Sequence, residues 1–292
     1  MAFTDTPFHL TLEAADLYVE RVGPEDGPPV YYLHGGPGYN SYSFRDLMGD
    51  SLEQYLMIYA DQRGGGRSYA DRPFGLADLA DDVRAVLEAL NLDKVTLLAH
   101  GFGAAVATRF AATHPEMVDR LVLVGPWFSM PALAREVQRT AARLAGNPNL
   151  ALPAEADIPE GEGGPPADLV NEAFSMVAAK KIFDALEFPN ASARLRLEHS
   201  DSDALSGSLE TPTVSDPWDI DVTPLLDRLK APVVILAGQS DRTSVPGQVE
   251  AGLAALPHAL LSLFEGGHYP WLDDPEAFTE VLEQALSGPL AT

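Results

Sequence analysis

The first chemical feature of the chain is a short turn, AHGFG at residues 99–103, which follows a largely apolar run at residues 94–98. Its small first and last residues suit the sharp strand-to-helix turn of the G-x-S-x-G motif, which projects a reacting serine from the end of a strand. Gly101 occupies the position of that nucleophile. Covalent catalysis needs a hydroxyl, thiol or carboxylate, so glycine excludes a covalent acyl intermediate at this residue.

A general base and a carboxylate to orient it follow late in the chain. His268 lies in an EGGHYP segment after an expected strand, and an imidazole with a reference pKa of about 6.5 can accept and return a proton at neutral pH. Asp241 follows the preceding expected strand, where its carboxylate can accept the ring N–H of His268 and stabilise the imidazolium. The chain order of turn, Asp and His predicts that all three meet at one site.

The segment HGGPG at residues 34–38 is the expected source of electrostatic stabilisation. We predict that the backbone N–H groups of Gly36 and Phe102 form an oxyanion hole, because Gly36 follows an early strand and Phe102 follows the nucleophile position. One such donor contributes about 3 kcal/mol of transition-state stabilisation. Neither donor depends on a side chain at residue 101.

A second glycine-rich segment, DQRGGGRS at residues 61–68, follows another strand. Its spacing is not that of a phosphate-binding P-loop. We predict instead that Asp61, Arg63 and Arg67 form an ion-paired brace for the oxyanion loop.

Together these motifs resemble the proline iminopeptidase branch of the α/β-hydrolase superfamily. HGGPG paired with DQRGGGRS is a specific combination, and the similarity covers almost the whole chain outside a central insertion. The resemblance implies a serine hydrolase that removes an N-terminal residue, often proline, from short peptides, with relatives that cleave other amides and esters. The expected partner is therefore a small-molecule or short-peptide substrate.

An aminopeptidase of this kind should hold the substrate ammonium with carboxylates of its lid. Glu198 is the predicted substrate-binding residue, because it lies in a stretch loosely similar to an Arg-x-x-Glu segment of the peptidases, and Glu172 and Glu187 are weaker candidates. The tryptophan- and glutamate-rich lid segment associated with those peptidases is not apparent here. An esterase, lactonase or amidase of the same fold is therefore an open alternative.

Two explanations of Gly101 are open. The glycine is an inactivating replacement of a serine, or it is natural. If it is natural, the protein binds a ligand in the pocket expected beside His268, or it uses His268 and Asp241 as a general base that acts on water or on a carbon acid.

The elements that must position these residues alternate between apolar strands and helical patterns. This predicts an α/β-hydrolase fold, with a mostly parallel eight-stranded sheet, helices on both faces and an inserted, mainly helical lid. The expected strands are residues 8–13, 16–22, 30–33, 55–60, 94–98, 121–124, 233–237 and 260–264, and the expected core helices include residues 76–90 and 275–286. Residues 1–126 and 222–292 are assigned to the core.

Residues 127–221 form the predicted lid, with helices at 131–144 and 167–188 and a mobile loop within 146–166. Open α/β sheets bind ligands at the carboxyl ends of their strands. A lid inserted at this point should therefore cover the site.

Composition excludes several other classes. The 292 residues carry a formal net charge of −24, which argues against nucleic-acid binding because phosphate contacts need clustered Lys and Arg. The chain has no cysteine, no metal-ligand spacing and no dinucleotide-binding motif, so no metal or cofactor is expected. No apolar run reaches the roughly 20 residues of a membrane span, and the N-terminus lacks a signal-peptide pattern. A cytoplasmic protein without membrane partners is expected.

Overall fold

The computed structural model describes residues 2–152, 164–204, 211–245 and 247–288. The strands are β1 (Phe3–Thr11), β2 (Ala15–Pro24), β3 (Pro29–Leu33), β4 (Leu56–Ala60), β5 (Tyr69–Ala70), β6 (Val95–His100), β7 (Val118–Val124), β8 (Val233–Gly238) and β9 (Leu260–Phe264). The α-helices are α1 (Tyr42–Met48), α2 (Leu76–Ala89), α3 (Gly103–Thr113), α4 (Met130–Leu144), α5 (Pro166–Met176), α6 (Ala179–Glu187), α7 (Ala191–Asp203), α8 (Gly247–Ala255), α9 (Pro270–Asp273) and α10 (Pro275–Ser287).

The strands form one sheet in the order β1-β2-β4-β3-β6-β7-β8-β9. Pairing is antiparallel from β1 through β2 to β4 and parallel across the rest of the path, so the predicted mostly parallel sheet is confirmed. The two-residue strand β5 pairs with β2 beside this path and makes a ninth strand. A strand of two residues is too short to show a periodic sequence pattern.

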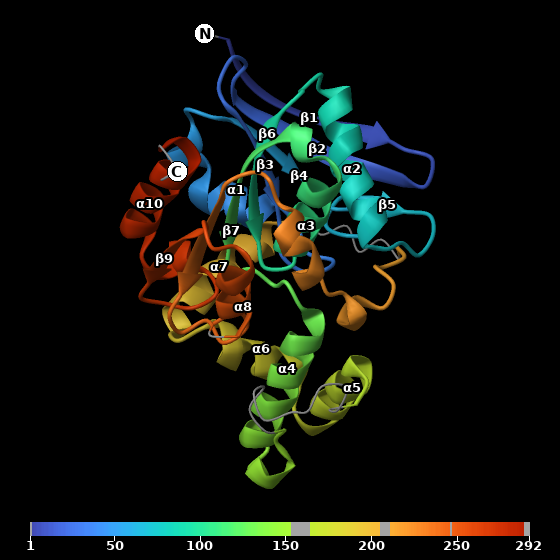
Figure 1. Ribbon diagram of the computed structural model, residues 1–292, viewed down its shortest axis with the longest axis vertical. Coiled ribbons are helices and arrows are strands. Elements are labelled where there is room, and N and C mark those ends of the chain that lie inside the picture. The colour runs from blue at the N-terminus through green and yellow to red at the C-terminus, as the bar shows by residue number, and fades with distance from the viewer. Residues whose placement is uncertain (1, 153–163, 205–210, 246, 289–292) are drawn as a thin grey trace.

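Helices cover both faces of the sheet (Figure 1). Alternate side chains of β3 point to opposite faces, and Tyr31 joins a core cluster with α2 and α3 whereas Tyr32 joins a second cluster with Phe44 of α1. In α2 the buried residues Val83 and Val86 follow the helical period. Full burial of an apolar side chain contributes roughly 1.5–3 kcal/mol, so the two clusters hold both helical layers against the sheet.

The chain between β7 and β8 leaves the core, and Figure 1 shows α4, α5 and α6 extending away from the sheet. The backbone N–H of Met130 donates to the carbonyl of Ile220 at 2.9 Å, and that of Val222 donates to the carbonyl of Phe128 at 2.7 Å. The segment between β7 and β8 therefore leaves the core and returns to it at adjacent points. The division into a core and a lid at residues 126 and 222 stays a prediction.

Within this excursion the helix predicted at residues 131–144 appears as α4. The single helix predicted at residues 167–188 is two helices, α5 and α6, because Val177 and Ala178 adopt extended backbone angles between them. Much of the predicted loop within residues 146–166 lies outside the described residues. No helix among the residues that the structure describes is long and apolar enough to cross a membrane.

Candidate active site

Gly101 forms the turn between β6 and α3. Its φ of +51° lies in the left-handed region, which side chains with a Cβ rarely occupy and which glycine adopts without strain. Its N–H donates to the carbonyl of Val124 at 3.0 Å, and its own carbonyl accepts from the N–H of Trp127 at 3.1 Å. Hydrogen bonds to the end of the neighbouring strand β7 and to the residues just after it therefore hold the turn in place.

The start of α3 lies directly against the loop that follows β3. A Cβ on Gly103 would stand 2.3 Å from the carbonyl oxygen of Leu33, so only glycine permits this approach of the two backbones. The contact brings Phe102 next to the segment that contains Gly36. The N–H groups of Gly36 and Phe102 are the candidates for an oxyanion hole, and that role stays a proposal.

Asp241 follows β8 and His268 follows β9, so the carboxyl ends of two neighbouring parallel strands bring them together. The distance from Nδ1 of His268 to Oδ2 of Asp241 is 2.8 Å. Asp241 is 0% exposed and His268 is 2% exposed. The pair is thus a buried imidazole–carboxylate unit.

Thr243 supports this pair. Its backbone N–H donates to Oδ1 of Asp241 at 2.9 Å, and its hydroxyl donates to the same oxygen at 2.5 Å. The hydroxyl also accepts from the indole N–H of Trp127 at 2.9 Å, and the hydroxyl of Ser244 donates to Oδ2 of Asp241. Sequence reasoning missed Thr243 and Trp127, because no motif marks either residue.

The environment shifts the pKa values of the pair in opposite directions. Burial by itself would raise the pKa of Asp241, but the charge of His268 and the hydrogen bonds from His268, Ser244 and Thr243 lower it below its usual value. Burial by itself would lower the pKa of His268, but the charge and hydrogen bond of Asp241 raise it. The arrangement therefore favours an imidazolium held by a carboxylate, which is the state that a general base reaches during acyl transfer.

The other ring nitrogen of His268 faces the turn. A Cβ built on Gly101 would stand 3.0 Å from Nε2 of His268 and 3.7 Å from the Cα of Gly35. A side chain at residue 101 would therefore contact the ring nitrogen that Asp241 leaves available. The structure brings the three predicted residues Gly101, Asp241 and His268 together.

His268 borders a cavity of about 340 Å³. Its lining combines the oxyanion loop, the base and the insertion: Gly35, Gly36, Pro37, Gly38, Tyr39, His100, Trp127, Met130, Phe183, Glu187, Pro217, Trp218, His268 and Tyr269. Its walls are mostly apolar and aromatic. Such a cavity suits a small substrate.

Glu187 is the glutamate in this lining. It is 9% exposed, and its carboxylate has no hydrogen-bond partner among the described residues. Burial raises the pKa of Glu187 to about 7, against an opposing effect of the His268 charge. A carboxylate held in this way attracts a cationic group that enters the cavity.

Glu198, the predicted substrate-binding residue, lies elsewhere. It stands on an exposed part of α7, where it accepts from Lys180 of α6 at 2.9 Å and pairs with Arg194 one turn earlier. Glu172 is also exposed, on α5. The structure does not bring either residue into the lining of the cavity, so Glu187, the weaker candidate in the sequence, is the one with suitable placement.

The predicted brace forms in part. The guanidinium of Arg67 donates to Asp61 at 2.7 Å, and Asp61 accepts from the backbone N–H of Ser41, just beyond the HGGPG segment, at 2.8 Å. Arg63 does not join them, because it pairs with Asp82 of α2. Within the described residues, no group of three or more His, Asp or Glu side chains is placed to hold a metal ion.

Comparison with known proteins gives relatives along the whole chain. A model of the alpha/beta hydrolase fold matches residues 28–145. The crystal structure of a proline iminopeptidase-related protein from Thermus thermophilus superposes with a TM-score of 0.82 at 33% identity, covering 98% of this chain and 99% of that chain. A proline iminopeptidase of Heyndrickxia coagulans is 26% identical over 273 residues, which cover 90% of this chain and 91% of the relative. An esterase from a Rhodococcus species shares the fold at 21% identity, with a TM-score of 0.66 and full coverage of both chains.

Proposed function

Because this chain belongs to the α/β-hydrolase family, in its proline iminopeptidase-like branch, we propose that its cavity binds a small substrate with a hydrolysable amide or ester bond. The proposed acyl group is an N-terminal prolyl or other aminoacyl residue. One observation carries the proposal. The position that a Cβ would take at Gly101 lies 3.0 Å from Nε2 of His268, whose Nδ1 lies 2.8 Å from Asp241.

The proposed roles follow from this geometry. Residue 101 is the position of the nucleophile, His268 is the general base, and Asp241 orients the ring and stabilises its protonated form. The N–H groups of Gly36 and Phe102 hold the developing oxyanion. With glycine at residue 101 the chain can bind and polarise the carbonyl, but it cannot form an acyl-enzyme there.

The aminoacyl specificity rests on Glu187. The substrate's ammonium group is the cation that this buried carboxylate suits, and it would lie in the same cavity as the carbonyl under attack. Pairing with an ammonium would compensate the desolvation of the ionised carboxylate. A plain acyl ester has no group to pair with Glu187.

A second candidate keeps the same residues but uses water. His268 would take a proton from a water molecule through Nε2, the hydroxide would attack the carbonyl carbon, and the leaving group would depart with the proton returned by His268. The intact pair of His268 and Asp241 favours this reading, because a protein that only binds its ligand does not need an oriented base. An ester or lactone is the expected substrate here, since its leaving group departs more readily than an amine.

A hydrolysis panel tests the proposal. The chain and its Gly101→Ser variant are assayed side by side with prolyl and other aminoacyl anilides and with short acyl esters. Activity that appears only in the variant and is highest with prolyl anilide supports the aminoacyl hydrolase. Ester hydrolysis by the unchanged chain supports the water mechanism, and inactivity of both folded proteins across the panel contradicts a hydrolytic site.

A further inference from the structure

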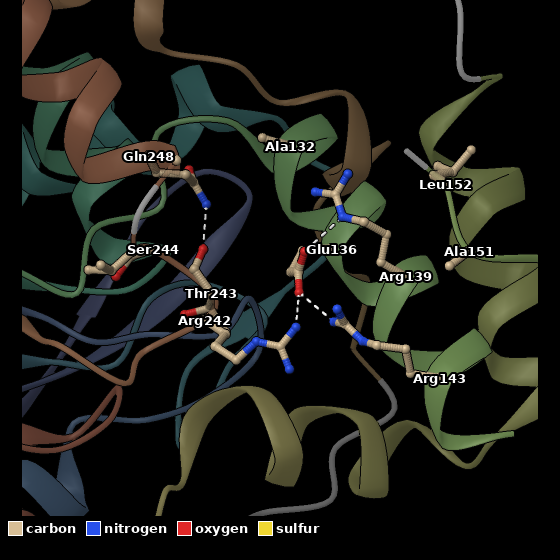
Figure 2. Close-up of a pocket in the computed structure, with 12 residues that line it drawn as sticks. Ala132, Glu136, Arg139, Arg143, Ala151, Leu152, Arg242, Thr243, Ser244 and Gln248 are labelled. Carbon is tan, nitrogen blue, oxygen red and sulfur yellow. Dashed lines mark hydrogen bonds and ion pairs between the residues drawn. The ribbon is translucent and has the colours of Figure 1, made fainter. Parts of the chain in front are cut away.

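A second cavity, of about 540 Å³, lies between α4, the segment after Asp241 and the start of α8 (Figure 2). None of its lining residues also lines the cavity beside His268. Figure 2 shows the guanidinium groups of Arg139, Arg143 and Arg242 turned toward the carboxylate of Glu136. The cluster joins a helix of the insertion to the loop that carries Asp241.

Positive charge exceeds negative charge in this cluster. Arg143 donates to Oε1 of Glu136 at 2.9 Å, and Arg242 donates to the same oxygen. Arg139 has further interactions of its own, so the excess of positive charge comes from Arg143 and Arg242. Two guanidinium groups share one carboxylate oxygen, in a chain whose net charge is −24.

Both arginines present further donors. The side chain of Arg143 is 47% exposed and that of Arg242 is 40% exposed. Their hydrogen bonds to Glu136 and Thr140 use one terminal nitrogen of each guanidinium. A guanidinium has five N–H donors in a planar fork that matches carboxylate and phosphate oxygens.

The remaining wall of the cavity also suits an anion. Helix α8 begins at Gly247, which lines the cavity, and the N-terminal end of a helix carries partial positive charge. Thr243 and Ser244 also line this side, but their hydroxyls donate to Asp241, so the positive groups of the wall are the arginines and the helix end. Glu136 is the carboxylate in the lining, and it already lies between the arginines.

We propose that this cavity binds a small dianion, a dicarboxylate or a phosphate, through the guanidinium groups of Arg143 and Arg242. The inference does not depend on the proposed hydrolytic function, because it uses no residue of the His268 cavity. A bound dianion would also hold the Asp241 segment in place. Arg242 is the next residue after Asp241, and its backbone N–H donates to the carbonyl of Leu186 in α6 at 2.9 Å.

Calorimetric titration with succinate and with inorganic phosphate, at ionic strength held constant with sodium chloride, tests the site. Saturable binding of one dianion per chain is expected. Arg143→Gln and Arg242→Gln should each weaken it by about tenfold or more, because each removes a charge-assisted contact. Arg84→Gln, which alters an exposed arginine paired with Glu88 on α2, should leave it unchanged.

Glu136→Gln should strengthen binding, because it removes the carboxylate that competes for both arginines. The expected change in affinity is opposite to that of the two arginine variants, so it distinguishes a charge effect from partial unfolding. Melting curves of every variant monitor unfolding independently. The anion that binds with the higher affinity shows whether the ligand of this cavity is a dicarboxylate or a phosphate. Absence of saturable binding for both anions, or equal affinity in Arg143→Gln, Arg242→Gln and the unchanged chain, would overturn the proposal.

Discussion

The backbone N–H of His268 donates a hydrogen bond of 2.8 Å to the carbonyl oxygen of Glu187. This bond ties the end of α6, in the insertion, to the segment that carries the proposed base. The carboxyl group of Glu187 lines the same cavity as the imidazole. The charge state of Glu187 should therefore affect both ligand binding and folding stability.

Binding of an amine ligand should depend on pH through Glu187. The pKa of this carboxyl is raised to about 7, so the fraction of the anion grows as pH rises through that value. Affinity for L-prolinamide, measured by calorimetry on the unchanged chain, should increase with pH as long as the ligand amine stays protonated. The unchanged chain suits this measurement because Gly101 cannot form an acyl-enzyme.

In Glu187→Gln the affinity should fall and most of this pH dependence should vanish. Because the charge of Glu187 also raises the pKa of His268, the comparison is repeated in a His268→Gln background, where the difference isolates Glu187. Glu172→Gln, which alters an exposed glutamate of α5, is the matched control. Identical pH profiles for Glu187→Gln and the unchanged chain would remove Glu187 from the binding site.

Glu187 should also lower stability at neutral and alkaline pH. Its folded pKa of about 7 exceeds the ordinary value of 4.5, so the folded state binds more protons than the unfolded state between these values. The free energy of unfolding should therefore fall as pH rises through this window, by up to about 3 kcal/mol from this group.

Urea denaturation of Glu187→Gln and the unchanged chain at several pH values checks this prediction. The variant should gain stability relative to the unchanged chain as pH rises from 4.5 to about 7, and the difference should level off above that value. A constant difference across the window would show that Glu187 titrates with an ordinary pKa.

Asp241 should control the activity of a restored nucleophile. In the Gly101→Ser background, Asp241→Asn keeps the shape of the side chain but removes the charge that stabilises the imidazolium and selects its tautomer. Loss of this charge should lower kcat by about three to four orders of magnitude. Asp119→Asn, which alters an exposed residue paired with Lys94, should leave kcat unchanged. Retention of most of kcat in the Asp241→Asn double variant would exclude the proposed role.

The substitution Gly101→Ser should cost stability. The φ of +51° disfavours a residue with a Cβ, and the new Cβ would approach Nε2 of His268 to 3.0 Å. Strain of this kind costs about 1–3 kcal/mol in the free energy of unfolding, measurable by urea denaturation.

Gly146→Ser provides the matched control, because Gly146 has a φ of +74° but no atom of the residues that the structure describes lies within 4 Å of the position that a Cβ would take there. Gly146→Ser should lose only the free energy of unfolding that the positive φ costs, so its loss should be smaller than that of Gly101→Ser. An unchanged or increased stability of Gly101→Ser would contradict the strained turn at residue 101.

The core elements and the three residues at the centre of the site were predictable, because each follows an apolar strand in a motif with a defined turn. Parallel strands end at one edge of the sheet, so motifs after β6, β8 and β9 necessarily converge. Motif spacing therefore placed Gly101, Asp241 and His268 without knowledge of packing.

The insertion could not be predicted to the same degree. Whether Glu187 or Glu198 faces the cavity depends on how α6 and α7 rotate against the core, and a helical pattern with glutamates on several faces does not specify that rotation. The break at Val177 and Ala178 is similar, because neither residue is a strong helix breaker. Thr243 is another case, since a threonine in a loop has no sequence signature of contact with Asp241.

Intact-protein mass spectrometry of the Gly101→Ser variant during turnover of a prolyl ester tests whether residue 101 is the nucleophile position beside His268. We expect a mass increase equal to one prolyl group, located at residue 101 by peptide mapping. It should be absent from the unchanged chain and from Gly101→Ser combined with His268→Gln. A folded Gly101→Ser variant that binds the ester but never carries the acyl group, or carries it at another residue, would contradict the assignment of residue 101 as the nucleophile position beside His268.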